Sequence, residues 1–309
     1  MSKRSAKLKA FQPHIPLLMA IIGAAMLGAS PIFVRMCEIG PNAIGAYRML
    51  FSLPLAWIWI QMEGRANPQS KAKPTVREWY LLGLAGFFFS LDLATWHLSI
   101  DMTSIINAAI FNNLTPIFVP LFIWALYALR PSPIYVLSAS MAIAGSIILT
   151  GSTVSLNPEH FAGDMLAISS AVAYSCYIII VKGLRHKFNA PTILFWTSLS
   201  NMFFLSVMCF YTGEQVALIT WEDWLGVLGL AILVHIFGQG LLTYSMGQLS
   251  AAFVSVVMLL GPVVSAILGW ALFGEAIGWI QTLGCVIVLS SIVSARVDEK
   301  AEKAKHATK

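Results

Sequence analysis

The chain has 309 residues, of which 58% are hydrophobic and only 11% are charged, and its mean hydropathy is +0.78. A soluble domain carries about 25% charged residues, so this composition excludes a soluble globular protein. Apolar runs of about 20 residues, the length that crosses a bilayer as a helix, recur from end to end. The net charge of +5 comes from Lys and Arg in predicted loops and tails. We interpret these cations as topology signals that contact anionic lipid, rather than as a nucleic-acid surface.

The apolar runs predict an all-α integral membrane protein with ten transmembrane helices. The basic start, MSKRSAKLKAF, resembles the n-region of a signal peptide. No small-residue cleavage site follows it, so we expect the first helix to be retained. The predicted spans are 15–36, 42–61, 78–99, 103–128, 132–151, 163–183, 190–211, 222–245, 250–273 and 277–296.

The basic residues fall into alternate loops, which indicates the orientation. With the N-terminus placed in the cytoplasm, 17 of the 19 Lys and Arg lie in inside segments, and only Arg35 and Arg48 fall elsewhere. Cytoplasmic loops of membrane proteins carry the excess of Lys and Arg. The sequence therefore predicts a multi-pass protein of the cell inner (plasma) membrane with both termini cytoplasmic.

An internal repeat appears when the chain is shifted by 146 residues. The segment from 82 to 129 then shows 11 identities over 48 residues without a gap, including the pair Pro116 and Pro262. Each half holds five spans, and an odd number means that the halves enter the membrane from opposite sides. We therefore expect two inverted five-helix repeats, at 15–151 and 152–296, between tails at 1–14 and 297–309. Inverted repeats are a common transporter architecture, with the substrate site near the midplane between the halves.

The stretch from Leu91 to Pro120 is apolar enough to be buried in the membrane, yet it is rich in polar side chains. Such groups at membrane depth usually face a protein interior or a water-filled cavity. Asp92 is suited to bind a substrate ammonium or to carry a proton, with structural pairing as the alternative. A functional His97 would act as a gate, and a structural one would sit at the membrane interface. The predicted solute-binding residues of this stretch are Asp92, Trp96, Asn107, Asn112 and Asn113.

Several residues outside this stretch are further candidates for the site. Arg48 breaks the rule that basic residues occupy loops, and it is suited either to clamp a carboxylate or phosphate or to pair with an acid. His235 and Gln239 share one helix face, and Tyr244 is an aromatic group near polar neighbours. The repeat mates Pro116 and Pro262 are the best hinge candidates. The mates of Asp92 and the three asparagines are Gly238, Phe253, Met258 and Leu259, so the scaffold is duplicated and its polarity is not.

The residues from Gly28 to Arg35 (GASPIFVR) and from Pro41 to Arg48 (PNAIGAYR) resemble the opening of an EamA domain of the drug/metabolite transporter superfamily. Leu98 to Pro116 is similar to the third and fourth helices of that domain. Leu260 to Glu275, followed by Gly284, is similar to its closing signature in a second copy. The first copy departs from this signature, because Ala128-Leu-Arg-Pro131 stands where Gly-Glu is expected. The resemblance implies ten helices, inverted repeats and the export or exchange of small metabolites.

These features predict a secondary active transporter, with export as the expected direction, of a small polar metabolite, in the first place an amino acid or a related compound. Transport would proceed by alternating access, and proton coupling is one option. A carrier of phosphorylated or nucleotide-linked solutes remains an alternative within transport. A membrane-embedded enzyme using Asp92 and His97 is the alternative of another class, although the chain has no GxSxG, HExxH or Walker A motif. The four cysteines form no CxxC pair, and we expect neither a metal nor a cofactor.

Overall fold

The computed structural model describes residues 14–66, 73–150, 160–274 and 277–307. These residues form helices and no strand. Nine segments of the described chain are long and apolar enough to cross a membrane, and Pro133–Leu149 is a shorter apolar helix between the fourth and fifth of them. The predicted all-α fold with ten membrane helices is confirmed.

The ten spans are built from fifteen helical elements in the described ranges, because four of the spans are broken. The first half holds α2 (Ile15–Gly28), α3 (Ser30–Arg35), α4 (Pro41–Ala66), α5 (Val76–Met102), α6 (Ile105–Asn112), α7 (Thr115–Tyr127) and α8 (Pro133–Leu149). The second half holds α9 (Phe161–Leu184), α10 (Ala190–Thr212), α11 (Trp221–Gly229), the π-helix η4 (Leu230–Gln239), α12 (Gly240–Ser245), α13 (Ala251–Met258), α14 (Leu260–Phe273) and α15 (Trp279–Ala307).

Three of the breaks lie just before a proline. Proline lacks a backbone N–H and clashes with the preceding turn, so the start of a helix accommodates it more readily than the interior, where Pro54 of α4 and Pro120 of α7 nevertheless lie. Pro31, Pro116 and Pro262 accordingly occupy the first turns of α3, α7 and α14. The fourth break is the π-helical segment η4, a geometry that often marks a functional site.

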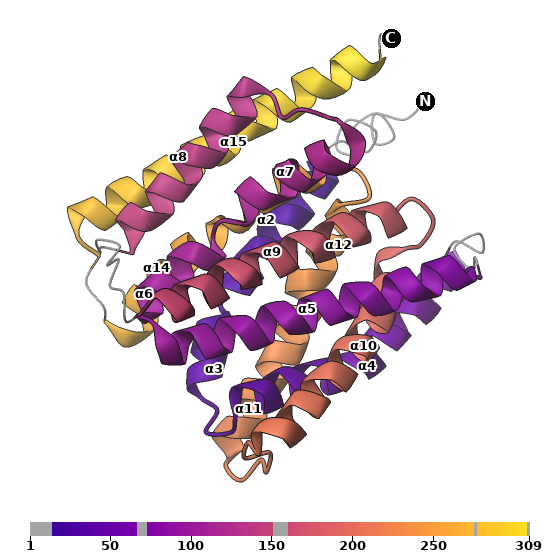
Figure 1. The fold of residues 1–309 in the computed structure, drawn as a ribbon, viewed down its shortest axis with the longest axis vertical. Helices are drawn as coiled ribbons and strands as arrows, with labels where there is room; N and C mark the ends of the chain where they lie inside the picture. Colours follow the sequence, from indigo (N-terminus) through magenta and orange to yellow (C-terminus); the bar gives the residue numbers. More distant parts are fainter. Residues whose placement is uncertain (1–13, 67–72, 151–159, 275–276, 308–309) are drawn as a thin grey trace, which may run out of the picture.

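The helix contacts show the two-fold relation between the halves. In the first half α5 and α7 pack on α9, and in the second half η4 and α14 pack on α2 in the corresponding way. Two other large contacts, α15 with α8 and α10 with α4, join equivalent helices of the two repeats, and the contacts of α10 with α5 and of α4 with η4 form a further matching pair (Figure 1). The core therefore lies between the halves, with each repeat covering an apolar face of the other.

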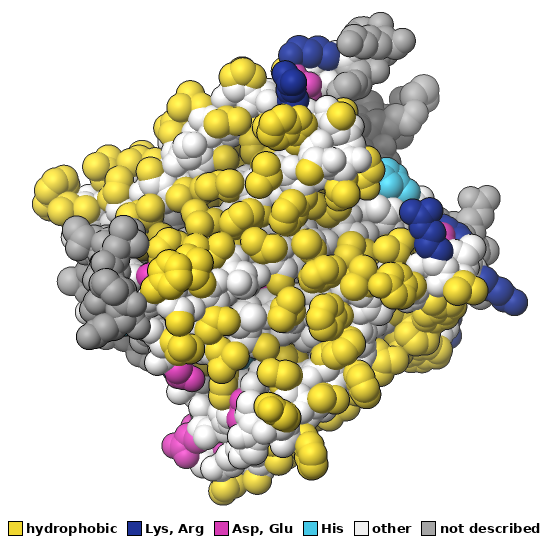
Figure 2. Space-filling model, in the orientation of Figure 1, with side chains coloured by type: hydrophobic (Ala, Val, Ile, Leu, Met, Phe, Trp, Pro, Cys, Tyr) yellow, Lys and Arg dark blue, Asp and Glu magenta, His cyan; other side chains and the backbone are white. Residues whose placement is uncertain are grey.

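Charged side chains lie at opposite ends of the bundle, with an apolar surface between them (Figure 2). We call the end that holds Glu38, Asp101 and Glu222 the acidic end, and the end that holds Lys182, Lys187 and Lys300 the basic end. Helices α3 and α8 end, and α15 begins, at the acidic end. A lipid bilayer would surround the apolar zone, as expected for a multi-pass membrane protein.

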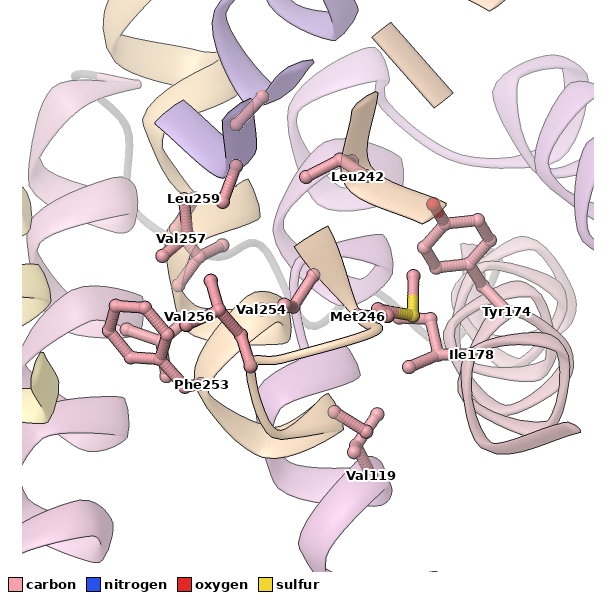
Figure 3. Close-up of a cluster of buried hydrophobic side chains, with 14 of the residues drawn as sticks. Val119, Tyr174, Ile178, Leu242, Met246, Phe253, Val254, Val256, Val257 and Leu259 are labelled. Carbon is pink, nitrogen blue, oxygen red and sulfur yellow. The ribbon is translucent and has the colours of Figure 1, made fainter. Parts of the chain in front are cut away.

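Figure 3 shows part of the large cluster of buried apolar side chains in the bundle. On the side of the basic end the cluster contains Val119 of α7, Ile178 of α9, Leu242 of α12 and the α13 residues Val254 and Val257, with Met246 between α12 and α13. We call these six residues the plug. Because all six are fully buried, they separate the middle of the bundle from the basic end.

The last helix differs from the predicted boundaries. We expected the span to end at 296 and a tail to follow, but α15 continues to Ala307. Its charged end is held by contacts that composition does not predict. Ser132 donates a hydrogen bond to Asp298 at 2.6 Å, and the backbone N–H of Ser250 donates to Glu299 at 2.7 Å.

Candidate solute-binding cavity

A cavity of about 540 Å³ lies between the two halves of the chain. It extends from mid-span residues of α4, α5, α9 and η4 to the ends of α3 and α8 and the start of α15, so it opens towards the acidic end. Predicted site residues that line it are Arg48, Asp92, Trp96, Asn112, Asn113, Gln239, Pro116 and Pro262. Eight of the twelve predicted binding, gating and hinge residues therefore line the cavity, and their contact with a solute stays a prediction.

Asp92 lies on α5 and is held by partners from both repeats. Its side chain is only 7% exposed. Ser170 of α9 donates a hydrogen bond to Asp92 Oδ1 at 2.5 Å, and Asn112 Nδ2 donates to the same oxygen at 3.4 Å. Asn112 also donates to Ser170 Oγ at 2.5 Å. A buried carboxylate requires such donors, because its desolvation is costly.

Arg48 of α4 faces the same cavity and is also only 7% exposed. Its Nε is buried, and no described residue accepts a hydrogen bond from it. The charges of Arg48 and Asp92 interact through space, but no direct ion pair joins them in the described part of the chain. The inner part of the cavity thus holds two opposite charges that are not joined by an ion pair, and a third charged residue, Arg35, lines the cavity where α3 ends.

The three asparagines of the fourth span have three different environments. Asn112 supports Asp92, as described above. Asn113 lines the cavity and donates a hydrogen bond to Ser146 of α8 at 2.9 Å. Asn107 is fully buried at the link between α5 and α6, where it donates to Asp164 at 3.2 Å. Asn107 does not line the cavity, and contact between Asn107 and a solute stays a prediction.

An aromatic layer forms the inner end of the cavity around Gln239. Tyr174 donates a hydrogen bond to Gln239 Oε1 at 2.9 Å, and Gln239 Nε2 donates to the Tyr177 hydroxyl at 3.1 Å. Phe89 stacks on Tyr177 with ring centroids 4.8 Å apart. His235 lies behind this layer, stacked on Phe89, with Nε2 2.7 Å from the Ser198 hydroxyl. His235 is therefore separated from the cavity by Phe89.

His97 and Tyr244 also lie away from the cavity lining. His97 packs against Trp96 with ring centroids 5.2 Å apart and the ring planes tilted by 48°, so it sits beside a cavity residue. Tyr244 lies beyond the plug, where its backbone carbonyl accepts a hydrogen bond from Arg185 at 3.4 Å and its ring faces the same guanidinium. A gating role for His97 and solute contact by Tyr244 stay predictions.

Ser170 is the main site residue that sequence reasoning missed. It is fully buried on α9 and makes the shortest contact to Asp92. The pair Ser169-Ser170 in an apolar span was the available signal, but serines in such helices are common packing residues. Only the contact between α5 and α9 identifies its partner.

The described residues contain no group of three or more His, Cys, Asp or Glu side chains arranged to hold a metal ion. Glu275, the last residue of the segment that resembles the closing signature, lies outside the described residues. The charged and amide side chains that line the cavity can bind a solute through charge and hydrogen bonds.

The model of the EamA-like transporter family matches residues 14–151 and again residues 161–296. A relative from Archaeoglobus fulgidus, named as an uncharacterized transporter, is 23% identical over 269 residues, covering 84% of this chain and 90% of its own length. An uncharacterized transporter from Bacillus subtilis is 22% identical, covering 86% of this chain and 87% of its own length.

Two further similarities concern function and fold separately. A Salmonella typhimurium protein named "Probable amino-acid metabolite efflux pump" is 27% identical over 164 residues, covering 50% of this chain and 54% of its own length. A protein of known crystal structure superposes with a TM-score of 0.78 at 17% identity, covering 93% of this chain and 98% of its own. At that identity the superposition shows the fold alone.

Proposed function

Because the chain belongs to the EamA-like transporter family, whose members are transporters and not enzymes, we propose that it is a secondary carrier of a small polar metabolite, in the first place an amino acid or a related compound. The observation that carries this proposal is the cavity between the repeats, which holds buried Asp92 and Arg48 at its inner part and is closed by the plug on the other side. The Salmonella relative named as an amino-acid metabolite efflux pump supports the same solute class.

The proposed mechanism is alternating access. The cavity opens towards the acidic end and the plug closes the basic end, so transport requires a second state in which this order is reversed. The breaks before Pro31, Pro116 and Pro262 lie at the cavity, where they would let half-helices move about a fixed site. Energy would come from a solute or proton gradient.

The proposed location is the cell inner membrane, with both termini in the cytoplasm. The basic end then faces the cytoplasm, as the excess of Lys and Arg in cytoplasmic loops requires. The cavity in this structure consequently opens to the outside. For an exporter, this is the state from which the solute leaves.

Uptake into proteoliposomes tests the proposed function. Purified protein is reconstituted, and labelled amino acids, related metabolites and sugar phosphates are screened with and without a pH gradient. We expect saturable uptake of at least one amino acid or related compound. Saturable uptake of phosphorylated solutes alone would reject the solute class, and the absence of saturable uptake of every solute would reject the carrier function.

A further inference from the structure

Arg48 and Asp92 face the inner part of the cavity without forming an ion pair, whereas Arg35, the third charged residue of the lining, lies where α3 ends. The separation of Arg48 from Asp92 defines the solute more closely. We propose that the cavity binds its solute as a zwitterion, with the solute carboxylate on Arg48 and the solute ammonium on Asp92. The solute class is then compounds that carry both a free carboxylate and a free ammonium group, as α-amino acids do. This proposal rests on the proposed function and adds the groups that recognise the solute.

Arg48 has no carboxylate partner among the described residues. An arginine this deeply buried normally has a carboxylate or a carbonyl partner, because an unpaired buried charge is costly. Here Nε has none among the described residues, and no ion pair is formed. The planar guanidinium fork matches a carboxylate, which it can hold by two parallel hydrogen bonds. A solute carboxylate would therefore supply the missing partner.

At Asp92, described residues donate hydrogen bonds to only one of the two carboxylate oxygens. Ser170 and Asn112 both donate to Oδ1, which fixes the orientation of the carboxylate. No described residue is bonded to Oδ2, and Asp92 lines the cavity. An ammonium group carries three N–H donors and no acceptor, so it suits a free carboxylate oxygen.

The second repeat lines the cavity with apolar side chains at the equivalent positions. Met258 and Leu259 of the second repeat line the cavity where their repeat mates in the first repeat are Asn112 and Asn113. Arg48 and Asp92 both belong to the first repeat. A zwitterion would place its charged groups on these two residues and its side chain towards Met258 and Leu259.

This arrangement discriminates by charge. A solute that has the carboxylate but no ammonium group would leave Asp92 without a partner. A solute that has the ammonium but no carboxylate group would leave Arg48 without a partner. Sites built to bond a polar group reject analogues that lack it, because the buried partner then stays unpaired. We expect each half-molecule to be transported at least about 10-fold less efficiently than the zwitterion.

The test uses the proteoliposomes described above and starts from the twenty proteinogenic L-amino acids. The amino acid with the highest ratio of Vmax to KM is compared with its carboxylate analogue, in which hydrogen replaces the amino group, and with its amine analogue, in which hydrogen replaces the carboxyl group. Wild-type protein is expected to show the 10-fold preference for the complete molecule.

Two variants then assign each charge to its residue. The Asp92→Asn variant should transport the amino acid and its carboxylate analogue equally well, while it still prefers the amino acid to the amine analogue. The Arg48→Gln variant should transport the amino acid and its amine analogue equally well, while it still prefers the amino acid to the carboxylate analogue. If Arg48→Gln fails to fold, Arg48→Lys, which keeps the charge, takes its place. The matched controls are Asp101→Asn, exposed on α5, and Arg65→Gln, exposed on α4. Both controls should behave as wild type.

The outcomes separate this proposal from the proposed function. Selective loss of one preference in each variant supports the zwitterion site, since a residue needed only for folding would lower all three rates together. Equal transport of the amino acid and either half-molecule by the wild type would overturn the zwitterion site and leave the carrier standing. Equal losses for all three compounds in both variants would also overturn it. Saturable uptake of other solutes but of no amino acid would overturn the zwitterion site as well, and only the absence of saturable uptake of every solute in the screen would reject the carrier itself.

Discussion

Ser170 of the second repeat contacts Asp92 of the first repeat. Its hydroxyl bonds to Asp92 Oδ1 and accepts from Asn112, so it controls which way the carboxylate points. A hydrogen bond to a charged group contributes about 1.5–3 kcal/mol, and 1.4 kcal/mol corresponds to a factor of ten. We predict that Ser170→Ala raises the KM for the transported amino acid about 10-fold or more.

The neighbouring serine provides the control for this prediction. Ser169 is exposed on the same helix, and its hydroxyl bonds to the Met165 carbonyl of its own helix at 2.8 Å. Ser169→Ala should leave KM unchanged. If both alanine variants have the wild-type KM, Ser170 does not position Asp92.

At the level of single residues, sequence reasoning identified the polar stretch and did not identify the role of each side chain. Asn107, Asn112 and Asn113 are the same residue type within seven positions, yet one bonds to Asp164, one to Asp92 and one to Ser146. Those partners come from α9, α5 and α8, so the roles depend on how the helices are packed. The spacing of the three asparagines along one span cannot predict which residues of other helices they bond to.

The contact between α2 and α14 shows how closely the two halves approach at the cavity. A Cβ atom at Gly28 would lie 2.6 Å from the backbone carbonyl oxygen of Gly261, and Ser265 donates a hydrogen bond to the Gly28 carbonyl at 2.6 Å. Backbone atoms cannot yield as a flexible side chain can. We predict that Gly28→Ala lowers the melting temperature of the purified protein, because α2 and α14 must separate.

Gly83 on α5 offers the matched control, since a Cβ atom there would meet nothing within 4 Å. Alanine favours a helix over glycine by about 1 kcal/mol, so Gly83→Ala should leave the melting temperature unchanged or raise it. Equal melting temperatures for Gly28→Ala and wild type would show that the approach of α2 to α14 is looser than described.

Side chains of other helices make several hydrogen bonds to the link between α12 and α13 at the basic end. Lys182 donates to the Met246 carbonyl at 2.7 Å, and Lys303 donates to the Gln248 carbonyl at 2.6 Å. Glu299 accepts the backbone N–H of Ser250 and pairs with Arg296. These contacts hold α13, which supplies Val254 and Val257 to the plug, so they stabilise the closed basic end.

Glu299→Gln should therefore weaken closure at the basic end. Losing a charged hydrogen bond of about 1.5–3 kcal/mol would shift the equilibrium between closed and open states by about 10-fold or more. We predict faster maleimide labelling of a Val257→Cys reporter in the plug, measured by mass spectrometry at pH 7. Native Cys37 will compete little, because burial, followed by the Asp223 carboxylate, raises the pKa of its thiol to about 11.

Glu302 provides the control for the gate, since it lies on the same helix and pairs with exposed Lys305. Glu302→Gln should label like wild type in the Val257→Cys background. An unchanged labelling rate in the Glu299→Gln variant would mean that the link is not what keeps the basic end closed.

For the whole molecule, the sequence was most informative about topology. Ten spans and two inverted repeats followed from apolar runs, the 146-residue shift and five spans per half, and the matching contacts of α5 with α9 and η4 with α2 agree with them. The plug was not predictable, because Val254 and Val257 look like any other apolar residues until α13 is packed against α7, α9 and α12. Which end is open depends on that packing.

The orientation of the bundle gives a further prediction, and α15 allows it to be tested with two positions on one helix. Trp279 is exposed at the acidic end and Lys300 is exposed at the basic end. We predict that a membrane-impermeant maleimide labels Trp279→Cys in intact cells, whereas Lys300→Cys is labelled only after permeabilisation. The reverse pattern would place the termini outside.

Trans-stimulation in proteoliposomes separates a carrier with alternating access from a passive pore. Vesicles are preloaded with the transported amino acid, and the initial uptake of the same labelled compound is compared with uptake into empty vesicles. We predict saturable uptake that is several-fold faster into loaded vesicles, since a loaded site returns more readily than an empty one. Uptake that is linear in concentration and unaffected by internal solute would show that the protein is not such a carrier.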